Sequence, residues 1–265
     1  MLNQIEPNTD ASDRAEMPIF VINLERSTDR LNHVARQLAD QAIHFERIPA
    51  VDGAAMPVEA MAAFVAARPR PGGLVWKPGQ VGCLLSHTEA WRRLVQTGAS
   101  HALVLEDDIR VSRDLKEFAT NRNWIPADAD IVRIETTGQW LKLAEKRPTV
   151  GGRHLAKVAS AAWATGGYVI SRDAAARLLE TDPRTHMPVD AFLFDVIRSQ
   201  VARKLRTIQV FPALVTQDKF DTAPGSGLLF ESEIETDNVR RDQHWQRLRR
   251  QITSRLAGKT EILFR

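Results

Sequence analysis

The sequence predicts an α/β protein in which helices cover the faces of a β-sheet. Short apolar runs rich in β-branched residues alternate with segments of helical periodicity along most of the chain. Its 265 residues suffice for one large domain with a sizeable core, and 43% hydrophobic with 26% charged residues is ordinary for a globular protein.

The elements follow in order from these patterns. Ser27 or Thr28 is placed to cap the first helix, Gly98 to end the third and Ser171 to cap the fifth. Strands are expected near residues 19–22, 43–48, 101–108, 128–135, 162–170 and 206–215. Helices are expected over residues 28–41, 57–67, 80–97, 110–121, 172–180 and 188–204. Residues 68–79 and 217–236 are rich in Gly, Pro and polar side chains and are expected to be loops.

Three segments are expected. Residues 1–16 form a polar, acidic and disordered leader, residues 17–236 form the main domain, and residues 237–265 form a basic amphipathic C-terminal helix or tail. Between Val239 and Lys259 there are seven Lys or Arg residues and one acid. The apolar side chains of this tail recur at helical spacing, which fits either packing on the domain or peripheral contact with an anionic membrane.

The composition excludes several classes of protein. The single cysteine, Cys83, excludes an intramolecular disulfide and a multi-cysteine zinc site, and it suits a reducing compartment. No apolar run approaches the roughly 18 residues of a membrane span, and the first residues lack the apolar stretch of a signal peptide. The expected location is therefore cytoplasmic, with contact at the inner face of the cytoplasmic membrane as a further hypothesis. The tail shows no nucleic-acid-binding module, so no nucleic acid is expected as a partner.

Three consecutive carboxylates, Glu106, Asp107 and Asp108, end the apolar strand "ALVLEDD". Like charges at this spacing repel each other. The repulsion is relieved either by exposure to water at the strand end or by a bound cation. Mg²⁺ and Mn²⁺ prefer oxygen ligands, and alternate residues of an extended chain can face one ion, which would pair Glu106 with Asp108 while Asp107 points elsewhere.

Other charged residues also follow predicted strands. Arg26 and Arg30 lie four apart in "NLERSTDR", where they either pair with nearby acids or reach a phosphate at a helix N-terminus. Ser86 and His87 follow a glycine in "GCLLSHTEAW", and Asp190 stands at the start of a helix as an N-terminal acid or a general base.

The order of "VINLERSTDR", "AVDG", "GQVGCLLSHTEAWRRL", "ALVLEDDI", "ATGGYVISRDAAARLL", "MPVD" and "FPALVTQD" resembles glycosyltransferase family 25, over about residues 17–220. That family includes bacterial lipopolysaccharide and lipooligosaccharide galactosyltransferases and the related collagen galactosyltransferases. The resemblance implies a GT-A type fold with a Rossmann-like mixed sheet and helices on both faces. It also implies inverting transfer of a sugar, commonly from UDP-galactose, to a sugar hydroxyl.

The resemblance implies roles for the motif residues. Asp108 is expected to be the principal ligand of Mn²⁺ or Mg²⁺, with Glu106 as partner and Gln217 or Asp218 completing the shell, although the histidine often found there is absent. Residues near the donor are expected to be Asn23, Arg26, Arg30, Asp52, Gly53, Ser86, His87, Glu106 and Asp107. A carboxylate must take the proton of the attacking hydroxyl, and the candidates are Asp190 first, then Glu135 and Asp195.

The expected partners are a nucleotide sugar and a glycan acceptor, which for a lipopolysaccharide enzyme is lipid-linked. Two alternatives stay open. One is transfer of another sugar, such as glucose or an N-acetylhexosamine. The other is a non-catalytic protein that binds nucleotide or carbohydrate on the same scaffold, against which the intact "EDD" argues.

Overall fold

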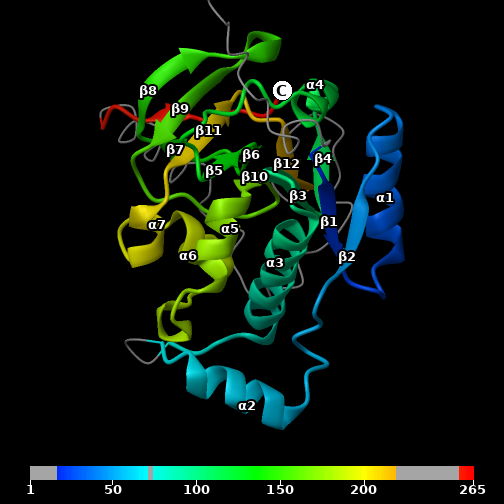
Figure 1. The fold of residues 1–265 in the computed structure, drawn as a ribbon, viewed down its shortest axis with the longest axis vertical. Coiled ribbons are helices and arrows are strands. Elements are labelled where there is room, and N and C mark those ends of the chain that lie inside the picture. The colour runs from blue at the N-terminus through cyan, green and yellow to red at the C-terminus, as the bar shows by residue number, and fades with distance from the viewer. Residues whose placement is uncertain (1–16, 71–73, 219–256) are drawn as a thin grey trace, which may run out of the picture.

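A computed structural model describes residues 17–70, 74–218 and 257–265 (Figure 1). Its centre is an eight-stranded sheet with the order β2-β1-β3-β10-β5-β11-β9-β8. The strands are β1 (Ile19–Asn23), β2 (Glu46–Pro49), β3 (His101–Glu106), β5 (Ile131–Arg133), β8 (Leu143–Pro148), β9 (His154–Val158), β10 (Gly167–Ser171) and β11 (Thr207–Phe211). Strands β2, β1 and β3 are parallel, as are β5 and β11, but β10 runs antiparallel between β3 and β5.

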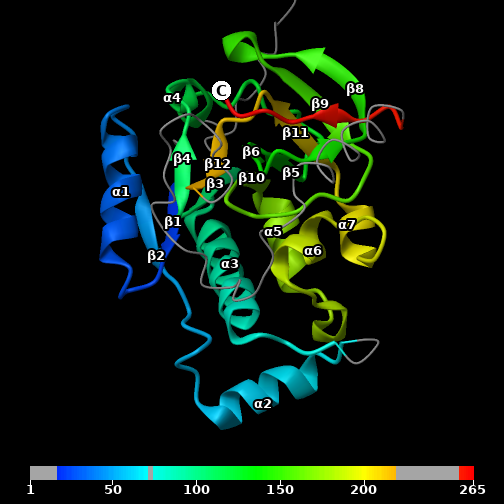
Figure 2. The ribbon, with the colours of Figure 1, turned by 180° about the vertical axis from the view of Figure 1, so that it is seen from behind.

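Helices cover both faces of this sheet, as Figures 1 and 2 show. Alternate residues of the buried strands point to opposite faces, so Phe20 and Val21 belong to two separate apolar clusters. One face carries α3 (Pro78–Thr97), α5 (Arg172–Leu179) and α6 (Val189–Phe194), and the other carries α1 (Thr28–Ala39) and α4 (Leu115–Thr120). The predicted α/β fold class, a Rossmann-like mixed sheet with helices on both faces, is confirmed.

Two expected helices differ in the structure. The segment 110–121 begins with strand β4 (Ile109–Val111), because its backbone pairs antiparallel with β12 (Val215–Gln217). The segment 188–204 is divided into α6 and α7 (Gln200–Lys204). The Asp195 carboxylate accepts hydrogen bonds from the backbone of Ile197 and Arg198, which forms a turn, and Ser199 then caps α7.

Most helix boundaries agree with the sequence signals. Helix α2 (Val58–Ala67) lies where the Ala-rich segment predicts it and is set apart from the sheet in Figure 1. Gly98 ends α3 with φ 72°, the left-handed conformation that glycine adopts without strain. The Ser171 hydroxyl accepts a hydrogen bond from the Ala174 backbone and caps α5. Short 3₁₀ turns occupy Val150–Gly152 and Pro183–Thr185.

Two small sheets complete the domain. Strand β12 pairs with β4 and with β6 (Glu135–Thr136), which brings the end of β12 against the end of β3. Strand β13 (Thr260–Glu261) pairs with β7 (Trp140–Leu141), and the following Ile262 is fully buried. Residues 260–265, which the sequence analysis assigned to the tail, thus pack on the domain. The predicted leader and the amphipathic part of the tail lie outside the described residues.

The described helices include none with the length and apolar character needed to span a membrane.

Candidate active site

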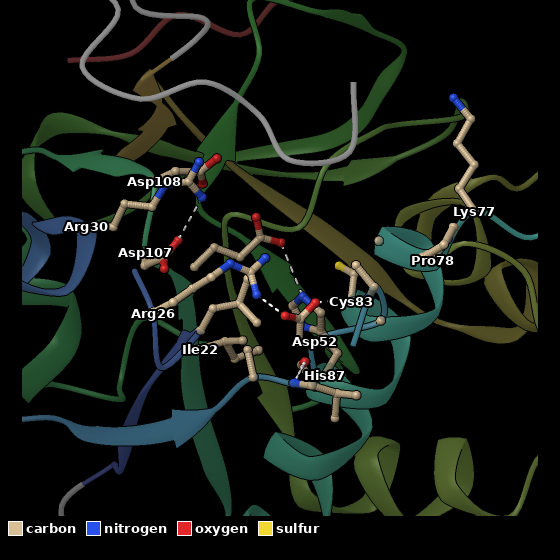
Figure 3. Close-up of a pocket in the computed structure, with 18 of the residues that line it drawn as sticks. Ile22, Arg26, Arg30, Asp52, Lys77, Pro78, Cys83, His87, Asp107 and Asp108 are labelled. Carbon is tan, nitrogen blue, oxygen red and sulfur yellow. Dashed lines mark hydrogen bonds and ion pairs between the residues drawn. The ribbon is translucent and has the colours of Figure 1, made fainter. Parts of the chain in front are cut away.

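A pocket of about 720 Å³ opens at the carboxyl ends of β1, β2 and β3 (Figure 3). Its walls come from the β1–α1 turn, the loop after β2, the first half of α3 and the end of β3. Ligands bind at this edge in open α/β sheets because the loops there diverge around a crevice. The predicted site residues that line it are Arg26, Arg30, Asp52, Gly53, Ser86, His87, Glu106, Asp107, Asp108 and Gln217.

The three consecutive carboxylates separate into two groups. Glu106 and Asp108 both face the side-chain amide of Gln217, whose Nε2 lies 2.8 Å from Glu106 and 3.4 Å from Asp108. Asp107 turns the other way, accepts a 2.7 Å hydrogen bond from Asn23 and lies 3.5 Å from Arg30. This is the alternation expected of an extended chain, and it places two carboxylates on one point.

Asp107 is buried beside its partners. Burial raises the pKa of the Asp107 carboxyl, while the hydrogen bond from Asn23 and the charge of Arg30 act in the opposite direction. Asn23 itself is buried and is not among the lining residues. It contacts the pocket through Asp107, and Arg47 donates to its Oδ1.

A buried chain of hydrogen bonds fixes Glu106. Trp91 Nε1 donates to the Tyr168 hydroxyl at 2.9 Å, this hydroxyl lies 2.8 Å from His87 Nδ1, and His87 Nε2 lies 3.2 Å from Glu106. The indole is only a donor and the carboxylate only an acceptor. The self-consistent assignment therefore has Tyr168 donate to Nδ1, and the His87 Nε2–H donate to Glu106.

Thr165 adds a second donor to the same carboxylate oxygen, at 2.7 Å. Glu106 is therefore held in one orientation from two sides before any ligand arrives, which is the rigidity that a cation or catalytic site requires.

The donor set fits a hard divalent cation. The carboxylate oxygens of Glu106 and Asp108 converge on the Gln217 amide, whose Nε2–H groups donate to both. Rotation of this amide about its last side-chain bond would exchange Nε2 for Oε1, which gives three oxygen ligands for such a cation. A nearby group, Cys83, His87 and Glu106, also has ligand atoms within 4.8 Å of one another. The proton that His87 Nε2 donates to Glu106 leaves no free nitrogen lone pair on that side, so the oxygen set is the better cation site.

The opposite wall of the pocket combines a loop with the start of two helices. Arg26 pairs with Asp52 across the opening, which joins the β1–α1 turn to the loop after β2 (Figure 3). The Ser86 hydroxyl accepts a hydrogen bond from the Val51 backbone at 2.8 Å and donates to the Gly82 carbonyl, so it attaches this loop to α3. Ser86 thus links the loop after β2 to α3 in the wall of the pocket.

Gly53 and Gly82 allow that loop to touch the helix. A Cβ on Gly82 would overlap the Val51 carbonyl oxygen and come within 2.8 Å of the Gly53 nitrogen. A Cβ on Gly53 would overlap the Pro78 carbonyl in the same way. Both glycines are therefore explained by close backbone approach and not by an unusual φ angle.

Replacing Gly82 by alanine is expected to destabilise the protein, because the added Cβ would displace the loop that carries Asp52. Overpacking of this kind costs about 1–3 kcal/mol in unfolding free energy. Thermal unfolding of Gly82→Ala measures the loss. Gly138→Ala is the control, since nothing lies within 4 Å of its added Cβ and only its φ of 70° opposes the change. A melting temperature of Gly82→Ala equal to that of the wild type would contradict the close approach of loop and helix.

The three candidate bases lie outside the set of lining residues, at different depths. Asp190 is half-buried in the first turn of α6, close enough to raise the pKa of Cys83 after burial and Glu106. Glu135 is fully buried, and its carboxylate contacts the Gly166 backbone at 2.7 Å and Arg133 at 3.4 Å. Burial raises the pKa of Glu135 to about 8.

The Asp195 carboxylate accepts hydrogen bonds from the turn that follows it, from the backbone of Ile197 and Arg198 and from the Arg198 side chain. Burial alone would raise its pKa, but hydrogen bonds from Arg198 and from the Ile197 backbone outweigh burial, and the pKa is lowered. Of the three acids, Asp190 is the one whose carboxylate is both partly exposed and near the pocket floor.

Several residues of the site carry no recognisable sequence signal. Tyr168, Trp91 and Thr165 act on His87 or Glu106 from β10, α3 and the segment before β10. Trp91 lies one turn after His87 on α3, and the antiparallel register of β10 against β3, with Gly167 opposite Leu105, brings Tyr168 and Thr165 there. The glycine pair in "TGGY" was the one available hint of close approach, and a Cβ on Gly166 would indeed come within 2.8 Å of Glu135.

The fold and this acidic pocket define an α/β protein with a ligand site at the carboxyl ends of its parallel strands. Residues 16–193 match the profile of glycosyltransferase family 25, described as a lipopolysaccharide biosynthesis protein family, and the chain belongs to that family.

Individual relatives include enzymes of animals and bacteria. Procollagen galactosyltransferase 1 of Danio rerio is 33% identical over 186 residues, 66% of this chain and 30% of the relative. Procollagen galactosyltransferase 2 of Homo sapiens is 28% identical over 83% of this chain and 37% of the relative. The lipooligosaccharide biosynthesis protein lic2B of Haemophilus influenzae is 23% identical, over 93% of this chain and 92% of its own. This chain thus spans well under half of the two collagen relatives.

A solved structure is also similar. It is a glycosyltransferase involved in the glycosylation of the major capsid of PBCV-1, with a TM-score of 0.40 and 12% identity, over 77% of this chain and 93% of that one.

Proposed function

We propose that this protein is a metal-dependent, inverting galactosyltransferase that moves galactose from UDP-galactose to a hydroxyl of a lipopolysaccharide or lipooligosaccharide acceptor. The observation that carries the proposal is the convergence of Glu106, Asp108 and Gln217 at one edge of a nucleotide-sized pocket. Names of relatives in family 25 support the sugar and the class of acceptor. The proposal includes a cytoplasmic location, which suits the single free cysteine.

Donor binding is assigned to the two walls of the pocket. Arg26 and Arg30 lie at the start of α1, where guanidinium groups and the helix N-terminus both favour an anionic diphosphate. Asp52 and Asp107 hold these arginines in place through ion pairs. The same carboxylates are hydrogen-bond acceptors for the ribose or uracil of the nucleotide.

Glu106, Asp108 and Gln217 would hold Mn²⁺ or Mg²⁺. When bound there, the cation neutralises the negative charge that develops on the departing UDP. His87 and Thr165 keep Glu106 oriented toward this point, since both donate to its other oxygen. Gln217 belongs to a strand rather than to a loop, which fixes its position relative to β3 through β4.

Asp190 is proposed as the general base. It lies near Cys83 on the floor of the pocket, and its half-buried carboxylate is able to accept the proton of a hydroxyl that attacks the anomeric carbon opposite the leaving group. Glu135 and Asp195 are weaker candidates, because both carboxylates are buried and bound by neighbouring donors.

A panel of nucleotide sugars with Mn²⁺, Mg²⁺ or chelator tests the proposal. We expect metal-dependent release of nucleoside diphosphate, and the UDP released from UDP-galactose should exceed the UDP released from UDP-glucose or UDP-N-acetylglucosamine and the GDP released from GDP-mannose. A preference for another nucleotide sugar would identify that compound, and not UDP-galactose, as the donor. No turnover with any donor, together with retained UDP binding, would favour a non-catalytic binding protein.

Replacing Asp190 by asparagine is expected to lower turnover by a factor of about 10²–10⁴, the usual contribution of a general base. UDP affinity should stay close to that of the wild type, because Asp190 is not among the residues that line the donor pocket. Initial rates and isothermal titration with UDP separate the two effects. The control is Asp173→Asn, which changes an exposed acid in the first turn of α5. Undiminished turnover of Asp190→Asn would remove the residue from this role.

A further inference from the structure

Trp163 is exposed on the segment that leads into β10. Among the residues that the structure describes, it is the only Phe, Tyr or Trp whose side chain is exposed, with 37% of its surface accessible. An exposed indole presents a large apolar face at low conformational cost, and such residues are concentrated at binding sites.

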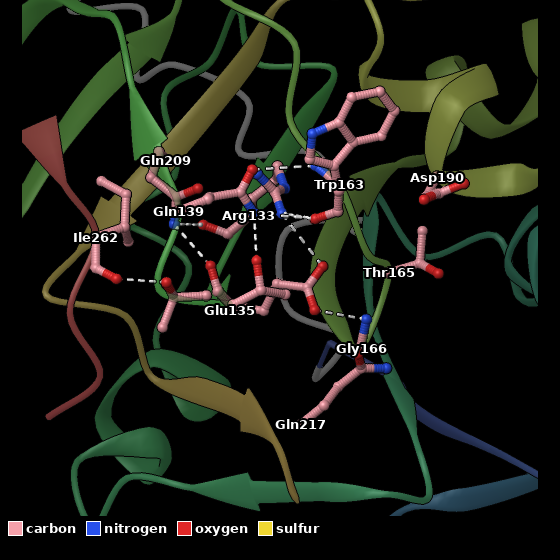
Figure 4. A network of polar contacts seen from close by, with 12 residues as sticks. Arg133, Glu135, Gln139, Trp163, Thr165, Gly166, Asp190, Gln209, Gln217 and Ile262 are labelled. Atoms are coloured by element: carbon pink, nitrogen blue, oxygen red, sulfur yellow. Dashed lines mark hydrogen bonds and ion pairs between the residues drawn. The ribbon is translucent and has the colours of Figure 1, made fainter. Parts of the chain in front are cut away.

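The backbone of Trp163 is fixed on both sides (Figure 4). Its N–H donates to Gln139 Oε1 at 3.1 Å, and its carbonyl accepts from Gln139 Nε2 at 3.1 Å and from Arg133 at 2.6 Å. Arg133 is fully buried and pairs with Glu135. A fully buried guanidinium is costly to desolvate, and here one of its hydrogen bonds is used to hold an exposed ring in place.

The same short segment continues to the acidic group. Two residues after Trp163, the Thr165 hydroxyl donates to Glu106, and Gly166 then exchanges backbone and side-chain bonds with Glu106 and Glu135. Two residues span at most about 7 Å. Ala164 between them has φ 70°, a left-handed angle that a residue with a Cβ adopts at a cost when the surroundings impose it.

Charged groups surround the ring. The guanidinium of Arg198 lies over the Trp163 ring, 5.4 Å from its centroid, and is itself held by Asp195. Asp190 is close enough to act on the pKa of Arg133, whose guanidinium donates to the Trp163 carbonyl. An apolar ring face with a cation over it and a carboxylate in its vicinity matches a pyranose, which has one apolar C–H face and a rim of hydroxyls.

We propose that Trp163 is the platform of the acceptor subsite, on which an acceptor pyranose stacks so that its hydroxyl faces Asp190. This assignment rests on the proposed function and deepens it, because it names a sugar ring as the group recognised on the acceptor side. Asp195 then positions Arg198 against the ring and takes no part in proton transfer. Arg133 and Gln139 position the platform from behind.

Ligand-observed saturation-transfer NMR tests the subsite directly. The probes are methyl β-galactoside, methyl β-glucoside and methyl N-acetyl-β-glucosaminide. UDP is present in each sample, and Mg²⁺ is the cation because Mn²⁺ is paramagnetic. We expect saturation transfer to the ring protons of one face of at least one probe. Trp163→Ala should weaken that probe about tenfold, which is the loss of one stacking contact, and Trp163→Phe should retain most of it.

Parallel titrations keep the two proposals apart. Calorimetric UDP affinity and thermal unfolding are measured for the same three proteins, so that a folding defect in Trp163→Ala is detected. Unchanged probe signals in a folded Trp163→Ala, or no signal with any probe while UDP binds, would overturn the subsite and leave the donor function standing. Probe binding to Trp163 without any UDP binding would overturn the proposed function instead.

Discussion

Replacing Asp108 by alanine is expected to abolish the stabilisation of the protein by UDP with Mn²⁺. A ligand at a hundredfold excess over its dissociation constant stabilises the wild type by about 2.7 kcal/mol, or roughly 5–10 °C in melting temperature for a domain of this size. Asp108→Ala removes one of two carboxylates that converge on Gln217, so a cation would keep one charged ligand and lose most of its affinity. Thermal unfolding with UDP, with Mn²⁺ and with both measures the coupling.

Two comparisons make this result specific. Asp40→Ala changes an exposed acid at the far end of α1 and should retain the full shift. Chelator should reduce the wild type to the behaviour of Asp108→Ala. A metal-dependent shift of equal size in Asp108→Ala would show that the cation binds elsewhere.

Replacing Glu135 by glutamine is expected to flatten the dependence of stability on pH. Burial raises the pKa of Glu135 from 4.5 to about 8, so between these values the folded protein holds a proton that the unfolded chain has lost. The proton on Glu135 therefore adds to the unfolding free energy. This contribution is fully present below about pH 4.5, declines as pH rises, and is lost above about pH 8. The slope reaches at most ~1.4 kcal/mol per pH unit in the unfolding free energy.

Guanidinium unfolding of both proteins from pH 5 to pH 8.5 measures the difference. Glutamine keeps a carbonyl oxygen for the Gly166 backbone and carries no proton to lose, so Glu135→Gln should gain stability relative to the wild type as pH rises. Glu89→Gln, at a half-exposed pair on α3, should follow the wild type. Parallel curves for wild type and Glu135→Gln would show that Glu135 is ionised throughout.

Helices and strands whose apolar residues form a clear pattern were predictable from the sequence, and strands without such a pattern were not. Strands such as "FVIN" and "ALVLE" are buried on both faces and read as continuous apolar runs. Strand β8, by contrast, is almost entirely exposed and has three charged residues in succession at its centre, so its pairing with β9 leaves no pattern in the sequence. The short strands β4 and β12 form through contact with each other, which no local window contains.

The site divides in the same way. Glu106, Asp108 and Arg26 follow strands, and parallel strands bring their ends together, so their proximity was predictable from chain order. The role of Tyr168 was not predictable from the sequence, because it depends on the direction of β10. A single sequence does not show whether one strand of a sheet is antiparallel to its neighbours. Gln217 was named by resemblance alone, and the metal, donor and base assignments stay predictions.

The hydrogen-bond chain from Trp91 to Glu106 has a consequence for protein engineering. Its inner members lie in the hydrophobic core, where thermostability libraries usually exchange aromatic residues for others of similar volume. Tyr168→Phe would pass such a selection as a conservative repacking while it removes the hydroxyl that sets the His87 tautomer. Variant screens on this scaffold therefore need an activity readout alongside the melting temperature, even for positions that never meet solvent.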